Sequence, residues 1–344
     1  MSAALKVVAP GLHTTLQDRG RFGFQALGVP VSGALDAESF EIANRLAGNP
    51  ADLPALEILH LGPTLEVATD CLRVAIAGGS AEIELLGERP TSLGAWRSVL
   101  LRRGQVFRVH RLGASVCCYL AAEGGFALKP VLGSASTYVR GGFGGFGGRA
   151  LAAGDMLPLM RETATERTEL SLAAPPEPGT ERPIRIVLGP QQDHFTEAAI
   201  GMLLAAEFTI SKNADRMGLR LEGPRLEHRG GWDIVSDGIA TGAIQVPGSG
   251  QAILLLADHQ TTGGYPKIAT VISADLPVVG RRKPGDRIRF AAVEVAEAEK
   301  LRREARAALD AAVASMAPPR PRSGLDLERL HEANLISGVV FDQL

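Results

Sequence analysis

The sequence predicts a mainly β protein built from two related domains in tandem. The chain has 344 residues, which is enough for two domains of ordinary size. Its 40 Gly and 21 Pro imply frequent turns between short elements. Several short sequence signatures also recur in the same order in both halves. A doubly wound α/β fold would need many helices alternating with strands, and the sequence has only three convincing helices.

Three segments have the pattern of helices. The first runs from Asp36 to Ala47, because Asp36 can cap the free N–H groups and Gly48 can end the helix. Asp36 is therefore expected to be a cap rather than a catalyst. The second runs from Asp193 to Glu207 with one apolar face. The third repeats apolar residues at helical spacing from Leu301 to Val313 and is expected to be a packing helix.

Strands are expected in the remaining segments. Residues Ala81–Leu85 and Gln105–Val109 alternate between apolar and polar side chains. Val116–Ala121 and Ala252–Leu256 are continuous apolar runs, which suit strands buried on both faces. The three cysteines are an odd number and two are adjacent, which resembles neither a disulfide framework nor a zinc site. They are expected to be core thiols in strands, namely Cys71, Cys117 and Cys118.

An internal repeat divides the chain. Four signatures of the first half resemble four of the second: 5–8 and 184–187, 62–66 and 223–227, 124–126 and 263–265, 154–157 and 285–288. A polar, Pro-rich stretch without periodicity separates the two sets, as expected of a linker. The predicted divisions are an N-terminal domain (1–160), a linker (161–183), a C-terminal domain (184–293), and a C-terminal helix and tail (294–344).

Composition excludes several classes of function. The formal charge of -2 provides no positive field for a phosphate backbone, so nucleic acid is not an expected partner. No apolar run approaches the roughly 18 residues of a membrane span, and the start lacks the pattern of a signal peptide. A cytoplasmic protein with no membrane partner is therefore expected. The seven histidines are scattered and no paired C-x-x-C is present, so no metal site is predicted.

A glycine-rich run covers residues 141–148. It lacks the following Lys and the strand-to-helix context of a phosphate-binding loop. We therefore expect a flexible surface loop, of the kind that can close over a ligand.

Two polar clusters place groups that are costly to bury beside glycines. The first covers residues 14–21 with 32–36, and the second combines 215–218, 245–247 and 258–267. In the second, two cations could hold a carboxylate or phosphate, while amides and hydroxyls could bind an amide or urea. Capping, turn formation and ion pairing at strand ends are the alternative explanation. The predicted catalytic residues are Asp258, Arg216 and Lys267, and Asp258 or His259 could move a proton. The predicted substrate-binding residues are Gln17, Asp18, Arg21, Gln245, His259, Gln260, Thr261, Thr262, Gly263, Gly264 and Tyr265.

The same motifs carry a family resemblance. The sequence resembles the biotin-dependent carboxyltransferase family in five motifs: Val8–Arg21, Gly33–Asp36, Ala43–Asn44, Asp215–Gly218 and Gln260–Tyr265. This family includes the C subunits of 5-oxoprolinases and is also called allophanate hydrolase subunit 2 or the Kip antagonist family. The resemblance covers roughly Leu5 to Val293. It implies two tandem cyclophilin-like β-barrel domains with a few short helices.

The resemblance also implies a function. Members work with a B-type subunit, and in bacteria the implied assembly, with an A-type subunit, is an ATP-dependent 5-oxoprolinase that opens 5-oxoproline to L-glutamate. ATP is then used by the complex, and this chain supplies half of a composite site. Biotin is not expected on this chain, because a carrier presents Lys between Met residues and none of the six Lys has Met beside it. A urea or amide carboxyltransferase with a separate biotin carrier and a regulator that binds a B-type (Kip inhibitor-like) partner stay open as alternatives.

Overall fold

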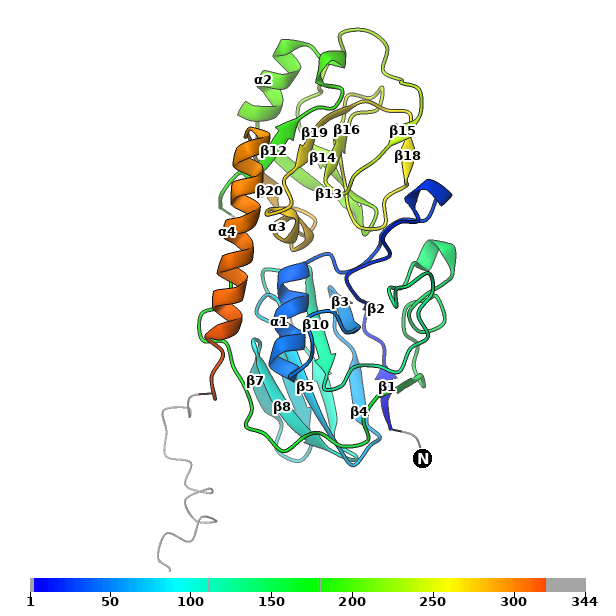
Figure 1. Ribbon diagram of the computed structural model, residues 1–344, viewed down its shortest axis with the longest axis vertical. Helices are drawn as coiled ribbons and strands as arrows, with labels where there is room; N and C mark the ends of the chain where they lie inside the picture. The colour runs from blue at the N-terminus through cyan, green and yellow to red at the C-terminus, as the bar shows by residue number, and fades with distance from the viewer. Residues whose placement is uncertain (1–2, 111, 178, 180, 320–344) are drawn as a thin grey trace, which may run out of the picture.

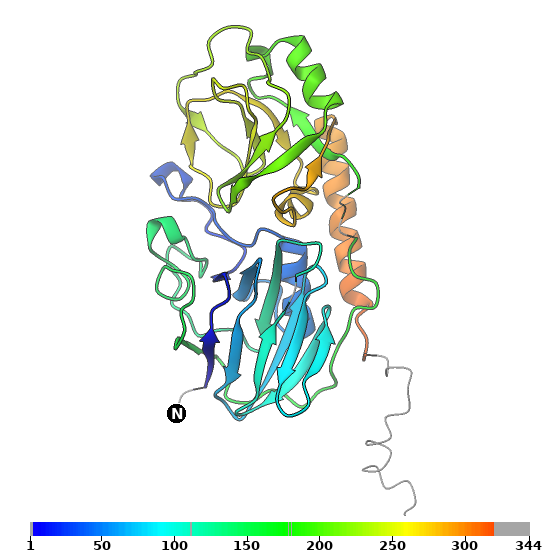
Figure 2. The ribbon, with the colours of Figure 1, turned by 180° about the vertical axis from the view of Figure 1, so that it is seen from behind.

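The computed structural model describes residues 3–110, 112–177, 179 and 181–319. Figure 1 shows two β-rich halves stacked along the long axis, with the helix α4 (Val295–Ala314) lying beside both. The view from behind shows the same placement of α4 (Figure 2). The described residues form many short strands and four α-helices, which confirms the predicted mainly β fold with few helices. The end of the predicted C-terminal helix and tail, from residue 320 on, lies outside the described residues.

The N-terminal half contains two antiparallel sheets. The six-stranded sheet has the order β11 (Met156–Pro158), β1 (Ala4–Ala9), β4 (Thr64–Val67), β9 (Val106–Val109), β6 (Glu82–Leu86) and β7 (Thr91–Gly94). The five-stranded sheet has the order β2 (His13–Gln17), β3 (Ala55–Leu59), β10 (Cys117–Ala122), β5 (Cys71–Ala77) and β8 (Arg97–Arg102).

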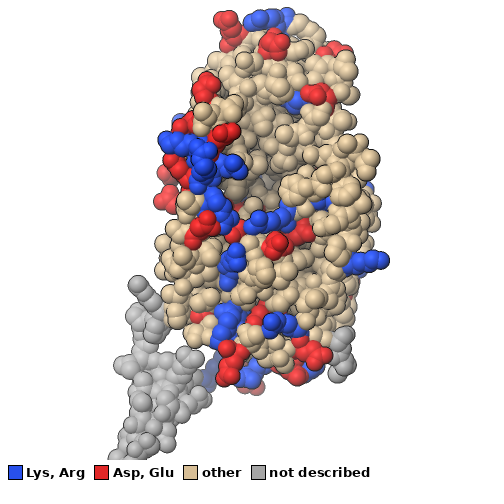
Figure 3. All heavy atoms as spheres, in the orientation of Figure 1, with Lys and Arg blue, Asp and Glu red and all other residues tan. Residues whose placement is uncertain are grey.

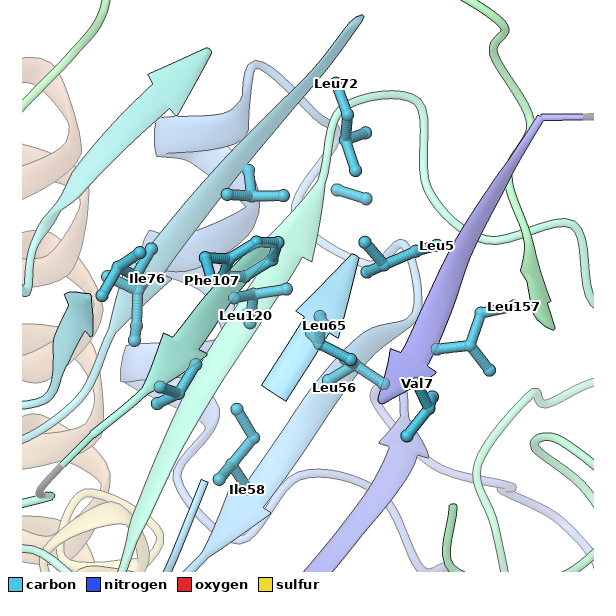
Figure 4. Packing of buried hydrophobic residues seen from close by; sticks show 14 of the residues in the cluster. Leu5, Val7, Leu56, Ile58, Leu65, Leu72, Ile76, Phe107, Leu120 and Leu157 are labelled. Carbon is cyan, nitrogen blue, oxygen red and sulfur yellow. The ribbon is translucent and has the colours of Figure 1, made fainter. Parts of the chain in front are cut away.

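The core of this half lies between its two sheets. Figure 4 shows Leu5 and Val7 of β1 facing side chains of the other sheet, among them Leu120 of β10. These three side chains have no exposed surface. Because strand residues alternate between faces, every second residue of each strand reaches this core.

Helices cover the outer face of the five-stranded sheet. The helix α1 (Ala37–Ala47) packs there through Phe40 and Leu46. Asp36 accepts a hydrogen bond from the backbone N of Ser39 at 3.1 Å, so the predicted cap is confirmed. Since the sheet is covered on both faces, all six residues of β10 are buried, as its continuous apolar run predicts. Leu309 of α4 completes this layer.

The C-terminal half is built around one eight-stranded, barrel-like sheet. Its order is β20 (Arg287–Ile288), β13 (Phe208–Asp215), β14 (Gly218–Glu222), β17 (Ile253–Leu255), β16 (Ala243–Gln245), β19 (Lys267–Val271), β12 (Ile184–Leu188) and β21 (Phe290–Ala292). All neighbours are antiparallel except β12 and β21. A small second sheet pairs β15 (Asp237–Gly238) with β18 (Thr262–Gly263).

The helices of this half differ from the sequence prediction. The helix α2 (Glu197–Ala205) begins four residues later than expected, because Thr196 is the cap and accepts from the backbone N of Ala199 at 3.1 Å. Asp193 lies instead in a short 3-10 turn. The helix α3 (Leu276–Gly280) was not predicted, since five residues are too few to show helical periodicity. None of the described helices is long and apolar enough to cross a membrane.

Only some of the repeated sequence signatures form equivalent structure in the two halves. Gly154 and Gly285 both have a φ of +89°, and each precedes a short strand, β11 or β20. Residues 62–66 lead into β4, whereas 223–227 follow β14 and form no strand. The two halves therefore share a pattern of turns more than an identical set of strands.

Candidate functional site

Two adjoining cavities lie where the halves meet. The larger, of about 800 Å³, lies over strands β13, β14, β16 and β17 and is also lined by Arg140 of the N-terminal half. The smaller, of about 260 Å³, is lined by residues of both halves, including Arg216 and Asp258. Arg140, Asp215 and Met217 line both cavities. Figure 3 shows the surface hollowed near this junction, with charged side chains gathered mainly toward the α4 side.

A tight turn carries Arg216 into the junction. Strand β13 ends at Asp215 and β14 begins at Gly218. The Oδ1 atom of Asp215 accepts from the backbone N of Met217 at 2.8 Å and of Gly218 at 3.3 Å, which holds the turn closed. A Cβ at position 218 would lie 2.7 Å from the Leu254 carbonyl oxygen, so this close approach requires glycine.

The Arg216 side chain is buried in a network of carboxylates. Its guanidinium donates to both carboxylate oxygens of Asp258, at 2.8 and 3.1 Å, and to the Gly33 carbonyl oxygen at 2.7 Å. A further N–H is bonded to the carboxylate of Glu57. Only 6% of the Arg216 side chain is exposed. Burial lowers the pKa of this guanidinium, but the charges of Asp258 and Glu57 outweigh it and hold the pKa above its ordinary value.

Sequence reasoning missed Glu57. It lies in the middle of β3, where every residue is buried. Its second oxygen accepts from the Tyr119 hydroxyl at 2.6 Å and from the backbone N of Leu35 at 2.9 Å. A charged residue inside an apolar strand needs a buried partner, and that signal could have drawn attention to Glu57. Arg216 and Glu57 belong to different halves, so their pair fixes the halves against one another.

Amide side chains form one wall of the larger cavity. Gln260 donates through Nε2 to Oε1 of Gln245 at 3.1 Å, and Gln245 donates to the Tyr265 carbonyl oxygen at 3.3 Å. A Cβ at Gly263 would lie 2.8 Å from Nε2 of Gln245, so glycine makes room for this amide. The Gln245 amide is therefore fixed in orientation. Gln245, Gln260 and Tyr265 all line the larger cavity.

His259 supports this wall from behind. It has no exposed surface, its Nδ1 contacts the Gln260 carbonyl oxygen at 2.5 Å, and its Nε2 contacts Oγ1 of Thr241 at 3.2 Å. Burial lowers the pKa of His259, which favours the neutral ring. A neutral ring can donate to the carbonyl and accept from the hydroxyl, which matches both contacts.

The N-terminal polar cluster holds a loop. Asp18 accepts from Ser134, Ala135 and Ser136. Gln17 donates to the Thr137 carbonyl oxygen at 3.2 Å. Arg21 donates to the carbonyl oxygens of Val131 and Ser136 and lies 4.9 Å from the centroid of the Phe143 ring. These contacts fix the segment that leads into the glycine-rich run.

The glycine-rich run is a compact loop beside the cavities. Its first turn is η2 (Val139–Gly141), and the backbone N of Tyr138 donates to the Phe143 carbonyl oxygen at 2.9 Å. Gly144 has a φ of +75°, and a Cβ there would overlap the Ser136 carbonyl oxygen. The glycines thus permit tight internal packing. Arg140 projects from this loop, and its Nη2 lies 3.5 Å from Oδ2 of Asp215.

The decisive comparison is with protein families. The model of the carboxyltransferase domain, subdomains A and B, matches residues 27–292. The chain belongs to this family. The C subunit of the 5-oxoprolinase of Haemophilus influenzae is 38% identical over 301 residues, which are 87% of this chain and 94% of that protein. Its counterpart in Escherichia coli, also named as the C subunit of 5-oxoprolinase, is 36% identical over 300 residues, with the same two coverages.

A solved carboxyltransferase structure is also similar. The urea carboxylase of Kluyveromyces lactis is 30% identical, with a TM-score of 0.81. The match covers 90% of this chain but 29% of that one, so this chain corresponds to less than a third of the larger protein.

Only some of the predicted site residues of this carboxyltransferase domain line the two cavities. Gln245, Gln260 and Tyr265 line the larger cavity, and Arg216 and Asp258 line the smaller. Lys267 lines neither: only 3% of its side chain is exposed, and its Nζ lies 2.9 Å from Asp237. The other predicted residues that line neither cavity are Gln17, Asp18, Arg21, His259, Thr261, Thr262, Gly263 and Gly264.

The described residues also test the predictions for the cysteines and for metal binding. Cys117 and Cys118 are buried in β10 and Cys71 is half-buried at the start of β5, so all three are strand thiols. No group of three or more His, Cys, Asp or Glu in the described part of the chain is placed to hold a metal ion.

Proposed function

We propose that this chain is the C subunit of an ATP-dependent 5-oxoprolinase, active with B-type and A-type partner subunits. The supporting observation is that two proteins named as the C subunit of 5-oxoprolinase are 36–38% identical over nearly nine tenths of the chain. The open cavity beside fixed amide groups agrees with an amide substrate. We place the reaction in the cytoplasm.

ATP supplies the activation that a lactam needs. An amide carbonyl is a poor electrophile, and transfer of the γ-phosphoryl group of ATP to its oxygen would release ADP and activate the carbon. Water then adds to that carbon, and the ring nitrogen leaves with a proton, which opens the ring to an acyl phosphate. A second water hydrolyses this acyl phosphate, which releases phosphate and gives glutamate. The amides of Gln245 and Gln260 would face the lactam, and Asp258 in the adjoining cavity is our first candidate for proton transfer.

The lining residues of the two cavities differ in character. Amides and exposed charges line the larger cavity, whereas the paired Arg216 and Asp258 line the smaller one. We therefore infer a site shared with the B-type subunit.

The test is glutamate formation from 5-oxoproline and ATP by the reconstituted complex. Each component is omitted in turn, and activity should disappear when this chain is left out. Normal activity without this chain, or none from the folded complete assembly, would reject the proposal.

A urea or amide carboxyltransferase is the second candidate. The observation that favours it is the TM-score of 0.81 with the Kluyveromyces lactis urea carboxylase. Because this chain shows no Lys beside Met, a separate protein would have to carry the biotin. Carboxylation of urea by the complex with a carboxybiotin donor would establish this function. Tight binding to the B-type subunit with no turnover of lactam, urea or amide would favour a regulator.

A further inference from the structure

Arg140 is an accessible cation that lines both cavities, whereas Arg216 is buried and Arg220 lines only the larger cavity. The Arg216 guanidinium is bonded to Glu57, Asp258 and Gly33 and is 6% exposed. The Arg140 side chain is 62% exposed and lines both cavities. A ligand anion can therefore reach Arg140 without breaking a buried ion pair, whereas at Arg216 it would have to displace two carboxylates.

The present partner of Arg140 is weakly held. Its Nη2 lies 3.5 Å from Oδ2 of Asp215, and 59% of the Asp215 side chain is exposed. Exposed ion pairs of this kind contribute little, because water screens them. Oδ1 of Asp215 is already used by the turn at Met217 and Gly218, so a departing Arg140 leaves that turn intact.

The segment that carries Arg140 is well supported. Asp18 and Arg21 hold residues 131–136, and Arg21 also covers the Phe143 ring, two residues after Gly141. The predicted substrate-binding residues of the N-terminal cluster thus fix the base of the loop. A fixed base limits the conformational freedom that Arg140 would lose on binding a ligand.

We propose that Arg140 is a specificity-determining residue that binds the carboxylate of an anionic lactam. It would leave Asp215 and make two parallel N–H···O bonds, the geometry for which guanidinium suits carboxylate. Gln245 and Gln260 would then face the amide of the same molecule, across the cavity that all three line. This inference rests on the proposed function, since 5-oxoproline has such a carboxylate and urea has none.

Binding and kinetics of the reconstituted complex test the assignment. Arg140→Gln should weaken 5-oxoproline binding in calorimetry, and raise its KM, by about 10- to 100-fold, because a charge-assisted bond is lost. The value of kcat should change much less, since Arg140 does not touch the reacting carbonyl. Arg140→Lys keeps the positive charge but cannot make two parallel N–H···O bonds, so its affinity for 5-oxoproline should lie between those of the unmodified chain and Arg140→Gln.

Two further variants sharpen the test. Arg149→Gln removes another exposed Arg of the same loop, which pairs with Asp155 and lines neither cavity, so binding should be unchanged. Asp215→Asn keeps the turn acceptor but removes the charge that competes for Arg140. It should tighten 5-oxoproline binding by up to about fivefold.

The possible results separate the two proposals. Normal turnover and normal 5-oxoproline binding by Arg140→Gln would overturn the assignment and leave the function standing. The same holds if Arg220→Gln, at the other cation of the larger cavity, shows the loss instead. A complex that binds 5-oxoproline through Arg140 but makes no glutamate would reject the function alone. No binding of 5-oxoproline by the unmodified complex would reject both.

Discussion

Removal of Arg216 should leave two buried carboxylates without their cation. The substitution Arg216→Met keeps an unbranched chain but deletes the four hydrogen bonds to Asp258, Glu57 and Gly33. Glu57 has no exposed side-chain surface and Asp258 has 8%, so water cannot replace the lost cation. Breaking a buried pair in this way costs about 3–5 kcal/mol.

The pH dependence follows from the same charges. The folded variant can relieve the repulsion by taking up a proton on one carboxyl. For a group with an ordinary pKa of about 4.3 this costs about 4 kcal/mol at pH 7.5 and about 1.4 kcal/mol less for each pH unit below. The folded variant then holds more protons than the unfolded chain, so the loss relative to the unmodified protein grows as pH rises. We expect about 3–5 kcal/mol at pH 7.5 and about 1–2 kcal/mol at pH 5.5.

Urea unfolding at the two pH values measures this loss, and Arg306→Met is the matched control. Arg306 also pairs with two carboxylates, Glu41 and Asp310, but its side chain is 46% exposed. Asp310 is exposed and the buried Glu41 keeps its bond to Arg19, so the loss should cost about 1 kcal/mol or less. Should Arg216→Met fail to fold, adding Glu57→Gln should restore folding by removing one charge. Equal losses for Arg216→Met and Arg306→Met, or a loss at Arg216 independent of pH, would refute the reasoning.

Three other predictions concern stability and reactivity. Burial lowers the pKa of His259, so its contribution to the free energy of unfolding should be complete above about pH 6.5 and fall by up to about 1.4 kcal/mol per pH unit below that value. In urea unfolding at several pH values, His259→Gln should remove this part of the pH dependence, and an unchanged pH dependence would contradict the prediction. Gly280→Ala should destabilise the chain by more than about 1 kcal/mol, because its Cβ would overlap the Leu35 carbonyl oxygen of the other half. Gly201→Ala, in an open site of α2, should stabilise by up to about 1 kcal/mol, and similar thermal unfolding of the two variants would disprove the clash. A thiol reagent at pH 8 should modify only Cys71 in the folded chain, since the other two thiols are buried; mass spectrometry showing a second label would be evidence against this.

Local signals in the sequence predicted much of the fold. The cap at Asp36 and the stop at Gly48 lie within one helix, so α1 was placed correctly from neighbouring residues. The apolar run at 116–121 predicted a strand covered on both faces. At α2 two residues able to cap lie three positions apart, and local pattern alone did not choose Thr196 over Asp193.

The site depended on partners distant in the chain. The cluster that contains Arg216 and Asp258 was visible in the sequence, but Glu57 is 159 residues before Arg216. Lys267 looked available for a ligand anion until the structure showed it beside Asp237. Arg140 was hidden at the edge of a run of glycines, and only the folded loop brings it to Asp215.

The placement of α4 has a consequence for synthesis of the chain. Its Leu309 packs against the layer that contains Phe40 and Leu46 of α1, and the backbone N of Ser171 donates to the Ala317 carbonyl oxygen. On the ribosome, the first half therefore emerges long before the residues that seal its outer face. Until translation passes residue 317, the part of this layer that α4 covers stays open to chaperones or to another nascent chain. A stop codon just after β21 would leave that part open permanently, so late truncations should damage the half that was made first.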